Sequence, residues 1–491
     1  MDFTALYAST APSYAQVSPG GEWIASFSRA GHILIRSTRS LELAFVFQVD
    51  EAFAKACQWI QWKPLNKDDD EEQEETSFLF VASSEKIIVI NLLEPEFYAI
   101  IQCAHDHVSR VQWTRTKQIL LFSDLHCRLT VWSVVQKKGL LLQQVKSQVR
   151  KGFAFHPTLP FAVVLHRKNG FDFAHLYQMS TENWKLSARW KIPTIDAQSI
   201  HWSPDGSRIA VVEAAFENSV YVYTSLGNYI TKICPPSNQQ ELGLCNLQWA
   251  PDGSYVLAHS LHNSSLRCLE PLAFSNALEF VHSYYPDLDA PTHVWQEDIN
   301  YQDQSKYKRL DKPPFIQKSY NATIRCKMNV DGTLLASCCN SVPNILWIWS
   351  VSSRSLHTML VQSAPIIQWD WHLYRSDLLV IRCAVHPSRS LDQASLLFFW
   401  SAAWAEPRII RVPKMGFIIR HHQWMKAAPS NGGREAIVVC GNSSYTIGYV
   451  VESEDDSETT MMPTMTFSDF ALSDEPLASE LDATKTITIQ M

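Results

Sequence analysis

Two histidine clusters are, by residue type, the most obvious metal-ligand candidates in the chain. His105, Asp106 and His107 are consecutive, and His421 is followed directly by His422. A zinc site needs three or four ligands that converge on one point. Two histidines close together in sequence are common by chance, so we expect a structural or surface role for both clusters and no metal site.

The neighbouring Cys338 and Cys339 are a second pair with reactive side chains. They fall in a predicted strand, where successive side chains point to opposite faces, so we interpret them as small buried apolar residues. None of the eleven cysteines is spaced as C-x-x-C, and the first residues lack a secretory signal pattern. These features predict reduced thiols in the cytosol or nucleus.

Motifs that build common enzyme sites are absent. The sequence contains no GxxxxGK[ST] phosphate loop, no GxGxxG dinucleotide fingerprint and no G-x-S-x-G nucleophile elbow. Repeats occupy nearly the whole chain and leave no room for a catalytic domain. The sequence therefore predicts a protein that is not an enzyme and binds no cofactor.

An internal repeat in the sequence predicts the strands and loops that carry the histidines and cysteines named above. IHWSPDGSRIAVV at 200–212 and LQWAPDGSYVLAH at 247–259 share an apolar stretch, an aromatic residue, a turn and a second apolar stretch. Most steps between repeats are 41 to 55 residues, and one step of 79 residues must contain an insertion. With decreasing similarity the pattern occurs nine times, around Val17, Trp62, Trp113, Phe155, Trp202, Trp249, Met328, Trp369 and Trp424.

Each repeat is typical of a short antiparallel sheet. Pro-Asp-Gly at 204–206 suits a tight turn, because Pro presets φ and Gly permits a positive φ. RIAVVEA at 208–214 and SVYVYTS at 219–225 are rich in β-branched residues, and the second alternates apolar and polar types, which predicts strands. Four short strands repeated every 40–50 residues or so are typical of a propeller blade, which buries both faces only against its copies.

The third strand of several repeats ends on tryptophan. LTVWSV (129–134), ILWIWSV (345–351) and LLFFWSA (396–402) carry Trp-Ser where WD-repeat proteins usually carry Trp-Asp. Without the acidic partner, the His-Asp structural tetrad of regular WD repeats is not expected. We expect irregular blades held mostly by apolar and aromatic packing.

The sequence thus predicts an all-β fold, a β-propeller of about nine WD40-like four-stranded blades closed by its N-terminal strand. FTALYAS (3–9) precedes the first unit, and the last unit has three strands, near 418–424, 434–440 and 443–451. Pairing the N-terminal strand with this blade would remove two open sheet edges. One large ring, a seven-bladed ring with two extra units and two incomplete rings all stay open.

The predicted layout has four parts. Units one to six occupy residues 1–283, with an acidic insert at 64–76, and an inter-blade insertion follows at 284–318. Units seven to nine occupy 319–451, with a shorter polar insert at 384–395, and the tail from 452 to 491 is expected to be acidic and disordered.

Charge is concentrated in two of these segments. The net charge is −7, residues 452–491 hold ten acids and one Lys, and residues 68–75 hold seven acids. The bases elsewhere are scattered, which argues against a specific nucleic-acid site. No run of about 18 uncharged apolar residues occurs, so membrane insertion is not predicted.

The insertion at 284–318 is the main candidate for partner binding. Aromatic side chains among charges on a long loop favour a docking surface, and the alternative is a loop packed across the propeller face. The six aromatic candidates are Tyr284, Tyr285, Trp295, Tyr301, Tyr307 and Phe315.

One block of the sequence resembles a known family. LLASCCNSVPNILWIWSVSSRSLHTMLVQSAPIIQWDW at 334–371 resembles the signature of the WD repeat-containing protein 8 family, of which this chain looks like a fungal-type member. The order of six units, an insertion and three more units agrees as well. We interpret the signature as scaffold, with Trp347 and Trp349 on one face of a strand. The matching residues are Asn340, Pro343, Asn344, Trp347, Trp349, Pro365 and Trp369.

The resemblance implies a non-enzymatic scaffold or adaptor of the cytoplasmic cytoskeleton, at the spindle pole body or centrosome. Such a protein would anchor microtubule minus ends at this microtubule-organising centre and contribute to the mitotic spindle. Its partners would be a coiled-coil minus-end anchoring protein, spindle-pole-body components and, in some cases, a kinesin-14 motor.

Two other functions stay open. One is a WD40 substrate receptor of a ubiquitin ligase or an RNA-processing scaffold, which would use the same propeller to bind different proteins. The other is an enzyme of the propeller-hydrolase type, which the missing nucleophile elbow disfavours.

Overall fold

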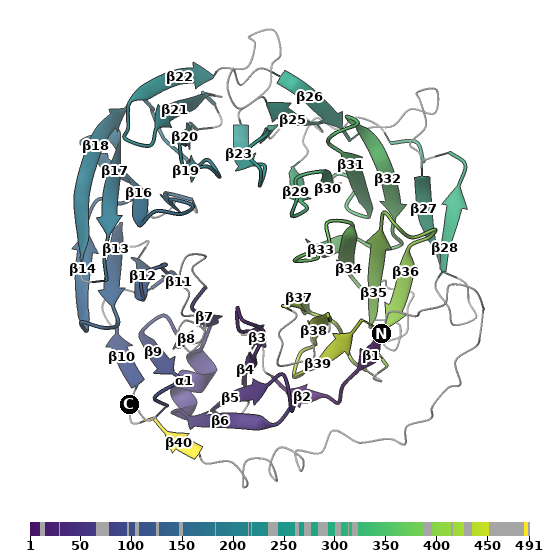
Figure 1. Cartoon of the computed structure of the whole chain (residues 1–491), viewed down its shortest axis with the longest axis horizontal. Helices are drawn as coiled ribbons and strands as arrows, with labels where there is room; N and C mark the ends of the chain where they lie inside the picture. Colours follow the sequence, from purple (N-terminus) through teal and green to yellow (C-terminus); the bar gives the residue numbers. More distant parts are fainter. Residues whose placement is uncertain are drawn as a thin grey trace. The chain divides into compact units, whose positions relative to one another are not determined.

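Figure 1 shows the computed structural model of the chain. Contacts divide the chain into two compact units, residues 1–113 with 417–491, and residues 114–416. The acidic insert beyond Pro64 and residues 451–485 of the tail lie outside the described part. The structure describes residues 1–9, 15–28, 30–64, 78–95, 98–103, 108–123, 127–146, 151–181, 183–214, 216–217, 219–233, 244–260, 265–269, 276–282, 293–299, 306–312, 314–316, 323–385, 395–413, 416–426, 435–450 and 486–489.

The first unit contains three sheets and a short helix. Their strand orders are β3-β4-β5-β6-β40, β10-β9-β8-β7 and β1-β39-β38-β37, with β2 also paired to β39. The elements are β1 (Asp2–Phe3), β2 (Tyr7–Ala8), β3 (Gln16–Val17), β4 (Trp23–Phe27), β5 (His32–Ser37), β6 (Leu43–Gln48), α1 (Glu51–Ala56), β7 (Trp59–Trp62), β8 (Phe78–Ala82), β9 (Lys86–Asn91), β10 (Tyr98–Gln102), β11 (Arg110–Trp113), β37 (His421–Met425), β38 (Ala436–Cys440), β39 (Ser444–Tyr449) and β40 (Thr486–Thr488).

The second unit contains six sheets, in which strands pair mostly in chain order. One of them has six strands, in the order β28-β27-β32-β31-β30-β29. The strands are β12 (Gln118–Ser123), β13 (Arg128–Ser133), β14 (Lys138–Leu142), β15 (Phe153–Phe155), β16 (Phe161–Lys168), β17 (Phe171–Met179), β18 (Trp184–Ile192), β19 (Ser199–Trp202), β20 (Arg208–Val212), β21 (Val220–Thr224), β22 (Tyr229–Ile233), β23 (Leu244–Trp249), β24 (Val256–Ser260), β25 (Ser265–Leu269), β26 (Asn276–Val281), β27 (His293–Asp298), β28 (Lys306–Leu310), β29 (Ile324–Met328), β30 (Leu334–Cys339), β31 (Ile345–Ser350), β32 (Ser355–Val361), β33 (Ile366–Trp371), β34 (Leu378–Cys383), β35 (Leu396–Ser401) and β36 (Arg408–Arg411).

The nine sheets formed by the described residues confirm the predicted class, an all-β propeller fold of nine WD40-like blades. Middle strands such as β9, β20 and β34 are buried along almost their whole length. A strand buried on both faces reads as a continuous apolar run, which explains IIVI in β9 and IAVV in β20. Each blade can bury these faces only against its neighbours, so the fold requires the repeat.

The N-terminal strand closes the last blade, as predicted. Phe3 pairs with Gly448, and Tyr7 pairs with Tyr445, so that β1 and β2 both lie antiparallel to β39 (Figure 1). The ring of Phe3 lies where a Cβ on Gly448 would be only 2.7 Å from it, so a glycine fits here. The predicted single strand is two short strands, Asp2–Phe3 and Tyr7–Ala8.

The prediction of a disordered tail is wrong for its last described residues. Thr486–Thr488 forms β40 and pairs in parallel with β6, with Ile487 opposite Phe47 (Figure 1). The amide of Ile489 donates to the Gln48 carbonyl at 2.9 Å, and the Ile489 side chain is buried. The alternation TITI is a strand pattern, and β6 offers it an open edge.

The insertion of the second unit folds as a β-hairpin. β27 and β28 pair antiparallel, and β27 joins β32 in parallel, with Trp295 opposite Leu360 (Figure 1). The hairpin extends the seventh blade from four strands to six. The segment is therefore an extension of one sheet.

The recurring tryptophan links neighbouring inner strands. The Nε1–H of Trp202 donates to the Ala154 carbonyl at 3.2 Å, and the Nε1–H of Trp371 donates to the Lys327 carbonyl at 2.9 Å. In the first unit Trp62 bonds to Gln16 in the same way, at 2.9 Å. The repeat pattern placed the eighth position at Trp369, but the last residue of β33 is Trp371, which makes this bond. Tryptophan recurs because it fills the gap between blades and satisfies a carbonyl across it.

Buried polar groups hold the blades together more than the sequence suggested. Asp172, fully buried, accepts from the Ala197 amide at 2.7 Å and from the Thr194 hydroxyl at 2.9 Å. Lys146 lies 3.3 Å from the same carboxylate and 2.6 Å from Asp196. The expectation of blades held mostly by apolar packing missed this network, because its members lie far apart in sequence.

Candidate protein-interaction surfaces

The hairpin β27–β28 is anchored through both of its faces. On one face Val294 is buried with Met359 and Trp347 in the core that the sixth and seventh blades share. On the other face Trp295 and Tyr307 pack against the core of the seventh and eighth blades. The hairpin is therefore held by two cores.

Polar contacts fix the hairpin in the same place. The buried carboxylate of Glu297 accepts from the Ser363 amide at 2.9 Å and from its hydroxyl at 2.6 Å. The Gln362 side-chain amide donates to the Tyr307 hydroxyl at 2.6 Å. These bonds join the hairpin to the segment that follows β32, so the hairpin presents its outer strand from a rigid base.

The six aromatic candidates of the insertion divide into three groups. Trp295 and Tyr307 are half-buried anchors of the hairpin, and the Tyr307 ring lies 6.3 Å from the Phe398 ring, edge to face. Phe315 has 63% of its surface exposed, next to the buried Ile316. Of these three, Phe315 remains a candidate contact. Tyr284, Tyr285 and Tyr301 lie outside the described residues.

The signature block forms the junction between the seventh and eighth blades. The Pro343 carbonyl accepts from the Ile366 amide at 2.7 Å, and the Asn344 carbonyl accepts from the Gln362 amide at 2.8 Å. The Asn340 side chain accepts from the Thr323 amide at 2.8 Å. Pro365 continues the junction with a carbonyl that accepts from the Ala384 amide at 2.7 Å.

The tryptophans of the signature belong to the two cores beside this junction. Trp347 and Trp349 stack with ring centroids 5.7 Å apart, in the core shared with the sixth blade. Trp369 lies in the core shared with the eighth blade, and the Arg325 guanidinium covers its ring at 4.8 Å. The block therefore packs three blades against one another, which agrees with its interpretation as a structural element.

One hydrogen-bond chain inside this scaffold was missed from the sequence. The Ser337 hydroxyl lies 2.8 Å from the His282 ring nitrogen Nε2 and accepts from the Trp349 Nε1–H at 2.8 Å. His282, Ser337 on β30 and Trp349 on β31 thus form one chain of hydrogen bonds. The sequence singled out the tryptophan of this chain, because Trp349 ends a predicted strand, but it did not indicate the pairing of Trp349 with Ser337 and His282.

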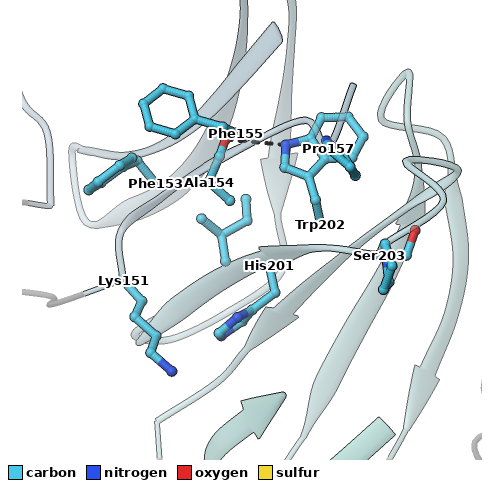
Figure 2. A pocket seen from close by; sticks show the side chains of 10 residues that line it. Lys151, Phe153, Ala154, Phe155, Pro157, His201, Trp202 and Ser203 are labelled. Atoms are coloured by element: carbon cyan, nitrogen blue, oxygen red, sulfur yellow. Dashed lines mark hydrogen bonds between the residues drawn. The ribbon is translucent and has the colours of Figure 1, made fainter. Parts of the chain in front are cut away.

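A cavity of about 340 Å³ opens between β15 and β19 (Figure 2). The dashed line in Figure 2 marks the hydrogen bond from Trp202 to the Ala154 carbonyl, which joins two of its lining residues. Its lining is mainly apolar, with two bases, and consists of Lys151, Phe153, Ala154, Phe155, Pro157, Ile200, His201, Trp202, Ser203 and Pro204.

The polar groups of this cavity are few. Burial, with a smaller effect from Lys151, lowers the pKa of His201 to about 3, so the imidazole is neutral at physiological pH. The Ser203 hydroxyl donates to the Asp205 carboxylate and also lies 3.3 Å from the Arg208 carbonyl, so it is held by its own turn. The described lining residues therefore offer apolar surface and one ammonium group.

The candidate metal ligands do not converge among the described residues. No group of three or more His, Cys, Asp or Glu side chains is placed there to hold an ion. His421 and His422 lie on β37, and His105 to His107 fall outside the described residues. Cys338 and Cys339 occupy different cores on the two faces of β30, as the strand prediction required.

In the described part, no helix has the length and hydropathy to cross a membrane.

Comparison with known proteins identifies the family. The chain is 37% identical over 494 residues to an uncharacterized WD repeat-containing protein of Schizosaccharomyces pombe, and the match covers 100% of both chains. The chain belongs to the WD repeat-containing protein family. This WD-repeat protein is also 21% identical over 386 residues to the WD repeat-containing protein WRAP73 of Mus musculus, which covers 72% of the chain and 79% of WRAP73.

The chain was also compared with family models and with solved structures. No family model matches the chain. Among solved structures, the C-terminal WD40 domain of Sif2 has a TM-score of 0.45 and 9% identity, and the match covers 84% of the WD-repeat protein and 99% of that domain. WD-repeat propeller proteins are generally non-enzymatic scaffolds that bind other proteins, and the WD-repeat protein has this architecture.

Proposed function

We propose that this WD-repeat protein is a non-enzymatic adaptor at the spindle pole body or centrosome. It anchors microtubule minus ends through a coiled-coil anchoring partner and helps to organise the mitotic spindle. A kinesin-14 motor and other spindle-pole-body components are further partners of the same adaptor, which works in the cytoplasm at the microtubule-organising centre.

The observation that carries this proposal is the signature block at 334–371, with its likeness to the WD repeat-containing protein 8 family. In the structure this block and the hairpin β27–β28 belong to the same six-stranded sheet and its junction with the next blade. A rigid sheet that presents an inserted hairpin suits an adaptor, because it holds partner contacts at fixed positions without an ordering cost on binding.

Phe315 is the candidate contact residue of the insertion. Its side chain is 63% exposed, directly before the buried Ile316 in the sequence, so an aromatic ring lies at the surface. Exposed aromatic rings of this kind often contribute most to the affinity of an interface.

A fluorescent fusion tests the cellular role directly. The proposal expects one or two spindle-pole dots in each mitotic cell and a loss of spindle anchoring when the gene is deleted. A diffuse signal throughout mitosis, together with normal anchoring in the deletion strain, would refute it. A purification dominated by cullin-ligase subunits or RNA-processing factors, without spindle-pole proteins, would favour the alternative scaffold functions.

A matched pair of variants tests the contact. Phe216 lies elsewhere in the second unit and has the same 63% exposure as Phe315. Phe315→Ser should reduce recovery of the coiled-coil partner by about tenfold, as expected for an aromatic contact worth more than 1 kcal/mol. Phe216→Ser should leave recovery unchanged. Equal recovery with both variants would exclude Phe315 while leaving the localisation test decisive for the function.

A further inference from the structure

The outer edge of β6 is already occupied by a segment that is far away in the sequence. β40 lies in parallel with β6, with Thr486 opposite Val46 and Thr488 opposite Gln48. Its pairing is three residues long, continued by one backbone bond from Ile489 to Gln48. Residues 451–485 separate this strand from the last blade.

Two isoleucines give this contact its side-chain specificity. Ile487 and Ile489 are two residues apart and therefore project from one face of the strand. Both pack into the core between the first two blades, where Ile489 is 3% exposed and lies in one cluster with Phe47 and Phe53 of α1. The alternate residues Thr486 and Thr488 are exposed. The edge of β6 thus selects an extended segment with apolar residues at alternate positions.

The pairing of β40 with β6 covers few residues compared with the stretch of sequence, 451–485, that connects β40 to the last blade. A strand of three residues and two apolar side chains must offset the ordering of its own backbone. Strand addition to a sheet edge is a general mode of peptide recognition, in which the backbone supplies affinity and alternate side-chain pockets supply specificity. A segment from another protein that has the same pattern can therefore compete for the edge.

We propose that the β6 edge is a docking groove for an extended partner segment of the type Ile-x-Ile, and that β40 occupies it in the absence of that partner. The partner segment runs parallel to β6, places its two β-branched apolar side chains beside Phe47 and Phe53, and releases residues 486–489. This groove is independent of the spindle-pole function proposed above, because it involves neither the signature block nor Phe315.

A released variant and a matched control test the groove. Ile487→Asp with Ile489→Asp places two charges in the buried positions and should free the edge, whereas Thr486→Asp with Thr488→Asp adds the same charges on the exposed face and should not. The probe is a fluorescent peptide with the sequence TKTITIQM, residues 484–491 of this chain. Fluorescence anisotropy should show it binding the isoleucine variant about tenfold more tightly than the wild type or the threonine variant, because only the free edge is competent.

Two control peptides distinguish strand addition from nonspecific hydrophobic binding. A peptide with both isoleucines changed to Asp should not bind, and a peptide with alternate N-methylated amides should lose binding because it cannot pair with an edge. Equal binding of the N-methylated peptide would overturn the proposal, and so would equal affinity of the probe for all three proteins.

A measurement on the wild type covers the case in which the isoleucine variant fails to fold. Excess TKTITIQM peptide should accelerate hydrogen exchange of the protein's own residues 486–489, read by mass spectrometry. Unchanged exchange at saturating peptide would overturn the proposal. A concentration-dependent dimer of the wild type that the isoleucine substitutions abolish would also overturn it, because the occupant would then be a second copy of this chain.

Discussion

The paired substitutions Trp371→Phe and Trp347→Phe separate the packing role of tryptophan from its hydrogen-bonding role. Both indoles are buried, with exposures of 8% and 1%. The Trp371 Nε1–H donates to the Lys327 carbonyl at 2.9 Å, whereas the Trp347 Nε1–H has no acceptor within the described structure. The same chemical change therefore removes a bond at one site and an unsatisfied donor at the other.

The magnitudes follow from this difference. Contraction from indole to phenyl leaves a cavity at both sites, which we take as about 1–2 kcal/mol from large-to-small core substitutions. At Trp371 the change also removes the hydrogen bond to the Lys327 carbonyl, which costs about 0.5–1.5 kcal/mol more. At Trp347 it removes an unpaired buried N–H, whose desolvation penalty of about 1–3 kcal/mol offsets the cavity. Trp371→Phe should thus destabilise by about 2 kcal/mol or more relative to Trp347→Phe.

Urea unfolding followed by circular dichroism is the assay. Both variants should keep the slope of the transition, and the midpoint of Trp371→Phe should be clearly lower than that of Trp347→Phe. A midpoint for Trp347→Phe equal to or below that of Trp371→Phe would refute the reasoning. It would mean that ring packing, and not the bond between blades, explains why tryptophan recurs at the ends of inner strands.

Three further predictions concern buried polar and tightly packed positions. Asp172→Ala should destabilise by about 2–4 kcal/mol in the same assay, because it leaves the buried Ala197 amide and the Thr194 hydroxyl without their acceptor while Lys146 keeps Asp196, and a loss below about 1 kcal/mol would exclude a structural role for the network. Gly206→Ala should lower the thermal midpoint more than Gly253→Ala; both glycines have positive φ, but only the first would place its Cβ 2.2 Å from the His156 ring. Burial lowers the pKa of His166 from 6.5 to about 3, so stability is complete above pH 6.5 and is lost as the pH falls from 6.5 toward 3. At pH 5 this loss should be about 2 kcal/mol, and His166→Phe should show a smaller loss between pH 7.5 and pH 5 in paired unfolding curves.

Local sequence patterns predicted the blades well because each pattern reports a local cause. Alternation and β-branched residues identified strands such as β20 and β21 within one or two residues of their ends. The orphan segment 3–9 and the three-stranded last unit predicted the closing pair, because an open sheet edge needs a partner. These inferences depend only on residues that are adjacent in the sequence and on the number of strands in each unit.

Partner selection between distant segments was not predictable in the same way. Trp295 and Tyr307 looked like docking residues because aromatic rings among charges favour an interface, but β27 pairs with β32, and this pairing turns both rings into the core. TITI at 486–489 had a strand pattern, but nothing local indicated that its partner is β6. Acidic composition suggested a disordered tail, and the pairing overrode it for these four residues.

The amino-acid sequence by itself determined the repeating unit, the four-stranded sheet and its need for copies, because hydrophobic periodicity and turn residues act over a few positions. The tertiary structure decided which side chains remain available for binding. Burial depends on which strand edge each insertion finds, and that choice depends on the summed packing of residues that are hundreds of positions apart. Phe315 and the edge of β6 are therefore candidate contacts that only the folded chain distinguishes from their neighbours.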